Sequence, residues 1–497
     1  MRFFILFGLV GLGWAQDPLV VEGTVVNALS GSPLRRVSVQ LVREGPVVAP
    51  VVTDVSGRFR FVGVKPGRYR VRAVRQGFFP DPGVAPTVEM TAGPGVTVPP
   101  VELWPGGSIS GTVSDEVGEP VAGVTVTLLR RAYLNGRREL LHVLNTVTDD
   151  RGRYRLFGLQ QDKYFVRADA PRVAGETMLY PPTFYPSLTE AEKATQVLLA
   201  AGQEQSGLNI ALRPMGGFRL AGRLINGLTN APVSNTTLSI ASRDSRVTAD
   251  ATLDQGGKFA VNGILPGVYD LVSSALYDHR LLQVRLLLDV RRDMEDLVLT
   301  LQPGVMVKVR MRVEGEGEVK WSGLRVAIES AEDVIGGGGM GRSDVEGKFE
   351  IGPLAAGRYT PKLHGLSAGA YLKAVKIGEQ DATLDLSGAS GQTVETIWVV
   401  STQGGKVTGK TAAGAVVALV PAADQPLRQS RYKAVEADSD GRYEITGVGP
   451  GSYQVYAFTK VEAGAWMDDA YLATLPDGGV AVKVEEKETK AVDVKAQ

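Results

Sequence analysis

The first residues that could do chemistry match a phosphate-binding loop. Residues 404–411 read Gly-Gly-Lys-Val-Thr-Gly-Lys-Thr, the G-x-x-x-x-G-K-T spacing that surrounds nucleotide phosphates with backbone N–H groups and a lysine. Only 86 residues follow Thr411, too few for the sheet that such a loop requires. Similar Gly-rich stretches recur at residues 106–107 and 216–217. We therefore expect this segment to open a strand, and we predict no nucleotide site.

Two further motifs are interpreted in the same way. Residues 336–341 have dinucleotide-binding glycine spacing but lead into a predicted hairpin and no helix, so we interpret them as a flexible loop. Residues 365–369, Gly-Leu-Ser-Ala-Gly, have the spacing of a hydrolase nucleophile elbow beside His364, yet that elbow needs a strand, a turn and a helix. The other histidines, His142 and His279, begin no zinc-binding pair. We expect no catalytic activity, no metal and no cofactor.

Aromatic side chains remain as candidates for binding. They fall in the same connection of three copies of the repeat described next, where rings could stack on the C–H faces of sugars or contact a protein partner. The alternative is that the rings cover the hydrophobic core. The candidate ligand-binding residues are Phe78, Phe79, Tyr180, Phe184, Tyr185, Trp466 and Tyr471.

Five copies of one sequence motif must position these residues. Each copy has an Asp, two variable residues, a Gly, a basic residue and an aromatic, and then a Tyr twelve positions after the Gly. Asp at the first position and Gly at the fourth predict a hairpin turn in which the Gly has positive φ. The next strand then alternates, with the aromatic inside and the basic residue outside. The anchor glycines are Gly57, Gly152, Gly257, Gly347 and Gly441, and the tyrosines are Tyr69, Tyr164, Tyr269, Tyr359 and Tyr453.

The hairpin turn accounts for the recurring Asp without a metal. Calcium at Asp149 and Asp150, or at Asp438 and Asp440, is the alternative. A second turn is predicted at the Pro-Gly pairs of copies one, three and five, with the glycine in the left-handed position. Helix is expected only at residues 187–194.

The repeat spacing sets the domain organisation. Successive anchor glycines are 95, 105, 90 and 94 residues apart, which suits a small autonomous sandwich. The fold class is all-β, with five tandem antiparallel Ig-like or transthyretin-like sandwiches. Because linkers are nearly absent, we expect an extended rod, on the order of 150 Å long. The predicted segments are a signal peptide at 1–15 and sandwiches at 16–105, 106–214, 215–304, 305–403 and 404–497.

Individual strands follow from alternation and from the Gly-rich junctions. The closing strands of the last copy are expected at 480–484 and 492–494. The five opening strands are expected at 21–26, 108–113, 218–225, 306–311 and 406–411. The second strands are expected at 37–41, 124–129, 237–240, 324–328 and 416–420.

The N-terminus and the charge balance limit location and partners. Arg2, an apolar run and Gly13-Trp14-Ala15 are typical of a secretory signal, so the mature chain is expected to start at Gln16, with no transmembrane anchor. The protein is predicted to be periplasmic, on the cell surface or extracellular. There is no Cys, which excludes disulfides. Lys plus Arg and Asp plus Glu both number 54, so no net charge attracts nucleic acid.

These features together resemble carboxypeptidase regulatory-like domains. The resemblance rests on an opening strand with an internal Gly, a Pro before strand two, the D-x-x-G-[RK]-[FY] hairpin and the P-G-x-Y-x-[VL] strand. It covers residues 18–497 and is weakest in the fourth copy, which lacks the strand-one Gly and the Pro-Gly pair. It implies transthyretin-like sandwiches, similar to starch-binding-like folds and to stalk repeats of bacterial collagen adhesins. It also implies export, and it constrains function only loosely.

Two functions stay open. The first hypothesis is a non-catalytic exported protein that binds carbohydrate or polysaccharide through the loop aromatics. The second is a structural or accessory protein of the cell envelope, such as a spacer, an adhesin stalk, or a partner of an outer-membrane transporter or peptidase.

Overall fold

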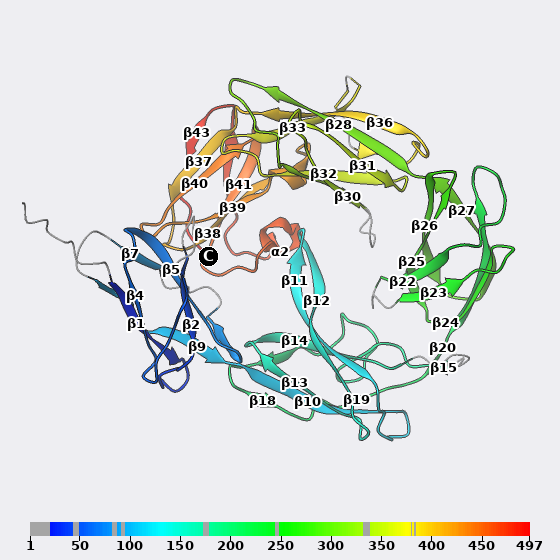
Figure 1. The fold of residues 1–497 in the computed structure, drawn as a ribbon, viewed down its shortest axis with the longest axis horizontal. Coiled ribbons are helices and arrows are strands. Elements are labelled where there is room, and N and C mark those ends of the chain that lie inside the picture. The colour runs from blue at the N-terminus through cyan, green and yellow to red at the C-terminus, as the bar shows by residue number, and fades with distance from the viewer. Residues whose placement is uncertain are drawn as a thin grey trace, which may run out of the picture. The chain divides into compact units, whose positions relative to one another are not determined.

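Nearly all regular structure in the described part of the chain is β-strand, and the helices described there are short segments between Arg428 and Leu472 (Figure 1). The computed structural model describes residues 20–42, 49–81, 87–90, 95–171, 178–243, 248–331, 338–378, 380–381 and 384–497. The predicted signal peptide and the start at Gln16 lie outside these residues.

The chain forms two compact units. Unit 1 holds residues 1–130, 142–169 and 183–212, and unit 2 holds residues 131–141, 170–182 and 213–497. The predicted division into five sandwiches, and the predicted rod, stay predictions, because each unit is described by itself. No helix among the residues described is long and apolar enough to cross a membrane.

The first sandwich has two sheets, ordered β4-β1-β9-β6 and β3-β2-β5-β7, and β8 also pairs with β1. The pairing of β1 with β9 is parallel, so the sheet is mixed and not wholly antiparallel. The strands are β1 (Val20–Asn27), β2 (Ser38–Val42), β3 (Val51–Val52), β4 (Arg58–Val62), β5 (Gly67–Val74), β6 (Phe78–Pro80), β7 (Thr87–Met90), β8 (Val96–Thr97) and β9 (Val101–Pro105).

The second sandwich repeats this plan with sheets β13-β10-β18 and β12-β11-β14-β16. Strand β19 also pairs with β10, and β17 also pairs with β14. A separate short pair joins β15 to β20. The strands are β10 (Gly107–Ser114), β11 (Thr125–Leu134), β12 (Arg137–Val147), β13 (Arg153–Leu159), β14 (Asp162–Asp169), β15 (Met178–Leu179), β16 (Thr183–Phe184), β17 (Val197–Leu199), β18 (Glu204–Gln205), β19 (Ile210–Ala211) and β20 (Met215–Gly216).

The third sandwich is one continuous sheet, β23-β22-β25-β26-β27-β21-β24, because β26 pairs with both β25 and β27. This hydrogen bonding closes one side of the layered structure. The strands are β21 (Phe218–Asn226), β22 (Thr237–Ser242), β23 (Thr248–Thr252), β24 (Lys258–Ile264), β25 (Gly267–Tyr277), β26 (Arg280–Val290) and β27 (Met294–Pro303).

The fourth sandwich returns to two sheets, β31-β28-β36-β33-β34 and β30-β29-β32-β35. Its core is built around Trp398, whose ring meets Phe349 edge-on at 5.5 Å between centroids. The strands are β28 (Val305–Glu314), β29 (Arg325–Ser330), β30 (Gly338–Arg342), β31 (Lys348–Leu354), β32 (Arg358–His364), β33 (Tyr371–Ile377), β34 (Gln380–Asp381), β35 (Leu384–Asp385) and β36 (Thr393–Ser401).

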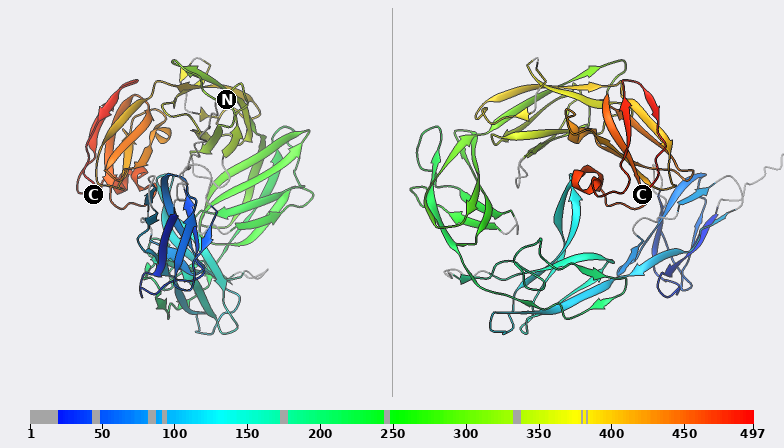
Figure 2. Two further views of the ribbon diagram at one scale, coloured as in Figure 1. Left: turned by 60° about the vertical axis from the view of Figure 1, so that its left-hand side comes forward. Right: turned by 180° about the vertical axis from the view of Figure 1, so that it is seen from behind.

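The fifth sandwich has sheets β40-β37-β43 and β39-β38-β41-β42 and carries the described helices (Figures 1 and 2). The strands are β37 (Gly405–Lys410), β38 (Val416–Pro421), β39 (Lys433–Glu436), β40 (Arg442–Val448), β41 (Gly451–Phe458), β42 (Val480–Val484) and β43 (Thr489–Ala491). The helices are α1 (Arg428–Arg431), the 3₁₀ turn η1 (Ala465–Met467) and α2 (Asp469–Leu472).

The recurring motif forms the predicted turn in all five copies. The Asp carboxylate accepts hydrogen bonds from the N–H groups two and four residues later, as Asp438 Oδ1 does from Asp440 at 2.9 Å and Arg442 at 2.8 Å. The anchor glycines have φ from 66° to 74°, which favours glycine. Each anchor carbonyl also accepts a hydrogen bond from the first strand, as Gly441 does from Thr411 N at 2.8 Å. The motif therefore closes a hairpin and binds it to the first strand through this hydrogen bond.

The tyrosine twelve residues after each anchor glycine makes a second recurring contact. Its hydroxyl donates to the carbonyl four residues earlier, at 2.6 to 3.0 Å, in every copy. These rings are 2% to 6% exposed, so the carbonyl supplies the polar partner that the hydroxyl of a buried tyrosine needs. The acceptors are the carbonyls of Lys65, Gln160, Leu265, Ala355 and Gly449.

The glycine inside the opening strand is explained by a close approach of backbone. A Cβ added to Gly409 would lie 1.8 Å from Val492 O, and one added to Gly111 would lie 2.1 Å from Leu208 O. In both copies a tyrosine hydroxyl binds that same carbonyl, from Tyr443 at 2.5 Å and from Tyr154 at 2.6 Å. The returning strand can pass this closely only because strand one lacks a side chain there.

Several local predictions were wrong. Residues 187–194 form turns and no helix, because a segment this short lacks the packed face that stabilises a helix. Strand β43 ends at Ala491, ahead of the predicted 492–494. Gly338–Arg342 is strand β30 and not a loop, while Gly336 lies outside the described residues. In the Pro-Gly pairs, Gly67, Gly267 and Gly451 do have positive φ, near 150°, which favours glycine, and each of them begins a strand.

Candidate functional site

The aromatic candidates of the first sandwich lie on edge strand β6. Phe78 and Phe79 pair with β9, opposite Pro105 and Trp104. Phe78 packs against the core and also lies under the Arg75 guanidinium, 4.7 Å from the ring centroid. Both residues are half-buried, so both are partly accessible to solvent.

The aromatic candidates of the second sandwich differ in exposure. Phe184 is buried, at 3% exposure, in β16 beside β14, which leaves no ring face for a ligand. Tyr185 is half-buried, and its backbone N–H donates to Val166 O at 2.9 Å. Tyr180, in the separate residues 170–182 of unit 2, is half-buried as well. Of the adjacent residues Phe184 and Tyr185, Tyr185 is therefore the more accessible.

The aromatic candidates of the fifth sandwich cover the outer face of its β38–β41 sheet. Trp466 in η1 and Tyr471 in α2 pack against a second apolar cluster that includes Tyr456 and Phe458. The Tyr456 and Phe458 rings are stacked at 6.1 Å, and Tyr471 lies 6.4 Å from Phe458. Both Trp466 and Tyr471 remain half-buried. These rings fix the inserted helices to the sheet and also border the surface.

A groove of about 500 Å³ lies beside α2 in the same sandwich. Its wall contains Tyr456, Leu472 and Pro421, with Arg428 and Asp469 on its polar side. Arg428 binds Asp469 with two parallel hydrogen bonds, at 2.9 and 2.6 Å. The Asp469 carboxylate raises the pKa of Arg428, while burial lowers it to a smaller extent.

Each motif with apparent catalytic spacing takes a structural role. The phosphate-loop match at 404–411 contains strand β37, paired with β40 and β43. Residues 365–369 connect β32 to β33, so no strand-turn-helix elbow forms. Among the described residues, no group of three or more His, Asp or Glu side chains is placed to hold a metal ion.

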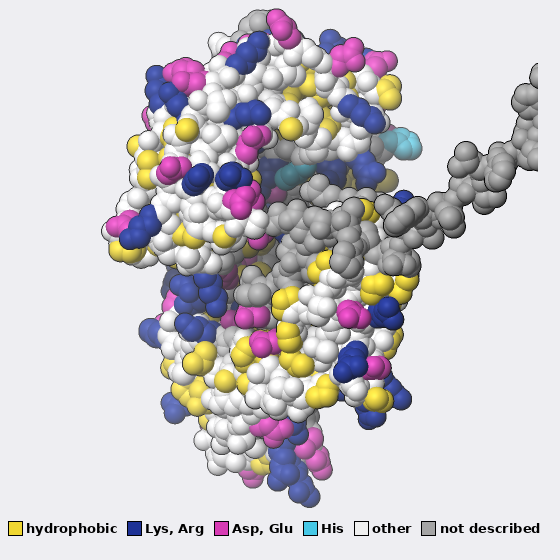
Figure 3. All heavy atoms as spheres, turned by 90° about the vertical axis from the view of Figure 1, so that its left-hand side faces the viewer, with side chains coloured by type: hydrophobic (Ala, Val, Ile, Leu, Met, Phe, Trp, Pro, Cys, Tyr) yellow, Lys and Arg dark blue, Asp and Glu magenta, His cyan; other side chains and the backbone are white. Residues whose placement is uncertain are grey.

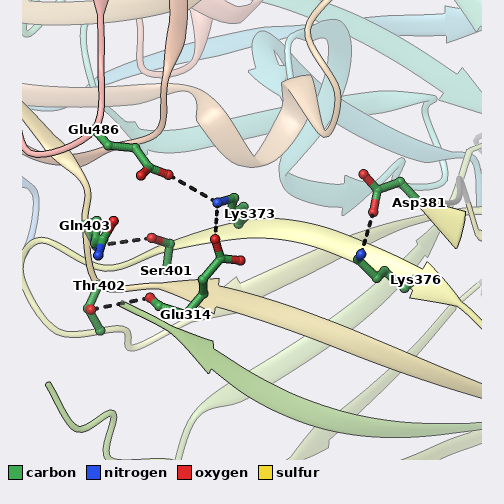
Figure 4. Close-up of polar contacts among 8 residues, drawn as sticks. All are labelled: Glu314, Lys373, Lys376, Asp381, Ser401, Thr402, Gln403 and Glu486. Atoms are coloured by element: carbon green, nitrogen blue, oxygen red, sulfur yellow. Dashed lines mark hydrogen bonds and ion pairs between the residues drawn. The ribbon is translucent and has the colours of Figure 1, made fainter. Parts of the chain in front are cut away.

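Sequence reasoning missed a charged cluster at the junction of the fourth and fifth sandwiches. Lys373 Nζ binds Glu314 of β28 and also Glu486 of the fifth sandwich, the latter at 3.2 Å (Figure 4). Lys376 lies 3.6 Å from Asp381. The hydrogen bond between Lys373 and Glu314 raises the pKa of the lysine and lowers that of the carboxyl.

A β-bulge positions this cluster. The pairing of β33 with β36 shifts between Leu372 and Ala374, so that Lys373 is the extra residue. A bulge redirects side chains, and here it brings Tyr371, Lys373, Ala374 and Lys376 to line one cavity. The sequence signal was the spacing of three between the two lysines, which breaks strict strand alternation.

Charges elsewhere do not segregate by sign on the face drawn in Figure 3. Basic and acidic side chains intermingle there, in keeping with 54 of each in the chain. No single-sign field is visible on this face that would attract a polyanion.

Comparison with solved structures finds bacterial pilins at low sequence identity. The chain is similar to a streptococcal ancillary pilin (11% identity, 58% of this chain and 100% of that chain, TM-score 0.21). It is also similar to the minor pilin GBS52 of Streptococcus agalactiae (14% identity, 40% and 96%, TM-score 0.27). A third is the major pilin subunit BcpA of Bacillus cereus (10% identity, 57% and 99%, TM-score 0.18). No curated protein matches the chain.

The family model of the carboxypeptidase regulatory-like domain matches two stretches of the chain, at residues 20–101 and 108–213. Both stretches contain the hairpin and the tyrosine contact described above. Residues 20–101 and 108–213 are therefore two tandem carboxypeptidase regulatory-like domains.

Proposed function

We propose that the protein is a non-catalytic structural or accessory protein, exported to the cell envelope or beyond. The observation that supports this best is the use of the recurring polar residues. The Asp, Gly and Tyr of each copy all make contacts that hold the hairpin and its neighbouring strand. The recurring Asp, Gly and Tyr therefore serve the stability of the fold in each copy.

The short junctions also suit a spacer. Strand β9 ends at Pro105 and β10 begins at Gly107, while β27 ends at Pro303 and β28 begins at Val305. A single residue between strands restricts the bending of one sandwich against the next. A chain of such units would carry tension or hold a partner at a distance.

Single-molecule stretching of residues 16–497 tests this proposal. If each copy is an autonomous sandwich, up to five unfolding events are expected. Each event should lengthen the chain by about 30 to 35 nm, from roughly 95 residues at about 3.5 Å per residue. Two large events would contradict five autonomous spacers and would instead match the two compact units.

Carbohydrate binding through the loop aromatics is the second candidate. It is favoured by the partial exposure of Phe78, Phe79, Tyr180, Tyr185, Trp466 and Tyr471. The test is retention of the chain on insoluble polysaccharide, comparing Tyr185→Ala and Trp466→Ala with the control Tyr277→Ala, an exposed tyrosine outside these sets. Loss of retention in the first two variants alone supports this function, provided that they remain folded. Absence of retention of the unmodified chain on every glycan tested contradicts it.

An envelope partner gives a different result. Co-purification of one envelope protein, unchanged by Tyr185→Ala and Trp466→Ala, would favour the structural or accessory role. Localisation is checked by fractionating cells and probing the periplasm, the surface and the medium. Retention in the cytoplasm would contradict export.

A further inference from the structure

The hairpin of β11 and β12 ends in an arm, residues 131–141, which belongs to unit 2 although the residues on either side of it belong to unit 1. Strand β11 pairs with β14 only as far as Arg130, so the arm extends beyond this pairing. Its turn is Asn135-Gly136, with φ of 51° and 78°, the two positive values of a type I′ hairpin. The arm is therefore a regular hairpin tip whose partners must lie outside its own sandwich.

One set of partners is on the fourth sandwich. Lys362 Nζ donates to Asn135 Oδ1 at 3.0 Å, and Asn135 Nδ2 donates to Glu329 Oε2 at 3.4 Å. Lys362 and Glu329 also form an ion pair at 2.7 Å, in which the lysine side chain is 14% exposed. The Asn135 amide thus binds both members of a partly buried ion pair, with its oxygen towards the cation and its nitrogen towards the anion.

The other set of partners is on the fifth sandwich. The Tyr133 ring lies 5.9 Å from the Tyr471 ring of α2, and Figure 1 shows the tip of the hairpin beside this helix. A Cβ added to Gly136 would lie 2.6 Å from Met467 O, so the turn fits against η1 only because it lacks a side chain there. We call the surface under the arm the seat; it consists of Glu329, Lys362, Met467 and Tyr471.

These contacts place the arm but are too few to fix it. In the described sheets, neither β11 nor β12 pairs with a strand of the fourth or fifth sandwich. A stable interface uses roughly 20 to 30 residues a side, more than the arm contains. Asn135 is also exposed, so water competes for its hydrogen bonds. Because arm and seat belong to one chain, the arm stays near the seat, which favours the closed state without making it permanent.

We propose that the arm is a reversible latch, which holds the seat when closed and uncovers Tyr471 when open. Closed, it keeps Asn135 and Lys362, 227 residues apart in the sequence, within hydrogen-bonding distance. Segments with few buried contacts open at the lowest free energy, so tension along the chain opens the latch before a sandwich unfolds. This use of the latch rests on the proposed spacer function, whereas the latch itself does not.

Thiol labelling of the full chain measures the opening, because the chain has no cysteine of its own. The thiol of Met467→Cys lies under the arm and should react slowly, whereas that of Gly478→Cys, where an added Cβ meets nothing within 4 Å, should react at the full rate. Asn135→Gly, added to Met467→Cys, should speed the reaction about two- to tenfold, the effect of one lost hydrogen bond. Gly-Gly also suits the turn, so the hairpin is kept. Asn145→Ala, at an exposed asparagine of β12 outside the arm, should leave the rate unchanged.

A cross-link distinguishes a latch within one chain from an exchange of arms between chains. A Cβ added to Gly464 would lie 3.4 Å from Tyr133 Cβ, close to the roughly 3.5 to 4.5 Å of a disulfide. With a mild oxidant, Tyr133→Cys combined with Gly464→Cys should therefore form a disulfide within the monomer. The control pair, Tyr133→Cys with Gly478→Cys, should not. Unfolding midpoints equal to that of the unmodified chain are expected, since the arm lies outside the sandwich cores.

Three results overturn the proposal. They are equal reaction rates in Met467→Cys and Gly478→Cys, no acceleration by Asn135→Gly, and a disulfide that is absent or forms only between copies. The stretching experiment is a separate measurement, so the two proposals fail separately. Five unfolding events together with an unprotected thiol in Met467→Cys would keep the spacer and remove the latch. Two events together with a protected thiol would keep the latch and contradict five autonomous spacers.

Discussion

Replacing Tyr453 with Phe removes one hydroxyl from the recurring tyrosine contact and leaves the ring. In the fifth sandwich this hydroxyl donates to Gly449 O at 2.7 Å, and the ring is 3% exposed. Gly449 is buried too, so its carbonyl would lose this bond with little access to water. A lost hydrogen bond costs about 1 kcal/mol, and an unsatisfied buried acceptor adds about 1 to 3 kcal/mol. We expect the fifth sandwich to lose roughly 2 to 4 kcal/mol of stability.

Hydrogen exchange measured by mass spectrometry locates this loss. A destabilisation of about 2 kcal/mol corresponds to roughly 30-fold faster exchange, since about 1.4 kcal/mol is tenfold. Amides of β38 and β41 should exchange faster by about this factor, while those of β28 and β36 in the fourth sandwich change less. Tyr277→Phe is the matched control, because Tyr277 is 45% exposed.

If β38 and β41 in Tyr453→Phe exchange less than about threefold faster, the hydroxyl contributes under about 0.7 kcal/mol. The tyrosine contact would then be incidental to stability. Equal acceleration in the fourth and fifth sandwiches would instead show that they unfold together.

Three further predictions test the same architecture. Burial raises the pKa of Tyr164 and of Tyr443 to about 12, and it also raises that of Tyr154, against about 10 in the unfolded chain. The stability that these three tyrosines contribute is therefore complete below about pH 10 and is lost as the pH rises towards 12. Thermal melts across this range should show a falling melting temperature, and the fall with pH should be shallower in Tyr443→Phe. An equally steep fall in Tyr443→Phe would contradict the raised pKa of Tyr443. Gly409→Ala should lower the free energy of unfolding, measured with denaturant, by more than about 3 kcal/mol, because the added Cβ would lie 1.8 Å from Val492 O. The control Gly414→Ala should cost only about 1 kcal/mol, because a Cβ there meets nothing within 4 Å and only the φ of 72° is unfavourable. Equal costs would show that the close approach of Val492 O does not explain Gly409. Asp438→Ala should lower the free energy of unfolding by about 1 kcal/mol, because it removes the acceptor for two N–H groups. Asp438→Asn keeps Oδ1 and should recover most of this loss in the same assay. If Asn does not recover the stability, the charge of Asp438 matters, as it would in calcium binding.

The elements whose causes are local follow from the amino-acid sequence. The Asp and the Tyr of each repeat make their hydrogen bonds within four residues, and the anchor Gly supplies the positive φ of the same turn, so the turn, the strand after it and the tyrosine position could be predicted from spacing. The opening strand of the second copy, expected at 108–113, is observed at Gly107–Ser114 for the same reason. The repeat register also showed that residues 404–411 open a strand and form no phosphate loop.

Other features depend on residues that are distant in sequence and meet only in the folded chain. Gly409 is required because the carbonyl oxygen of Val492 lies too close for a side chain. Phe184 is buried beside strand β14, with which its own strand pairs. Trp466 packs against the sheet that it covers. The cavity beside Tyr371 needs a one-residue bulge in β33 and a wall from the next sandwich. Turn chemistry acts through the nearest backbone groups and is written in the local sequence. Close approach, burial and cavities arise only when separate strands are brought together.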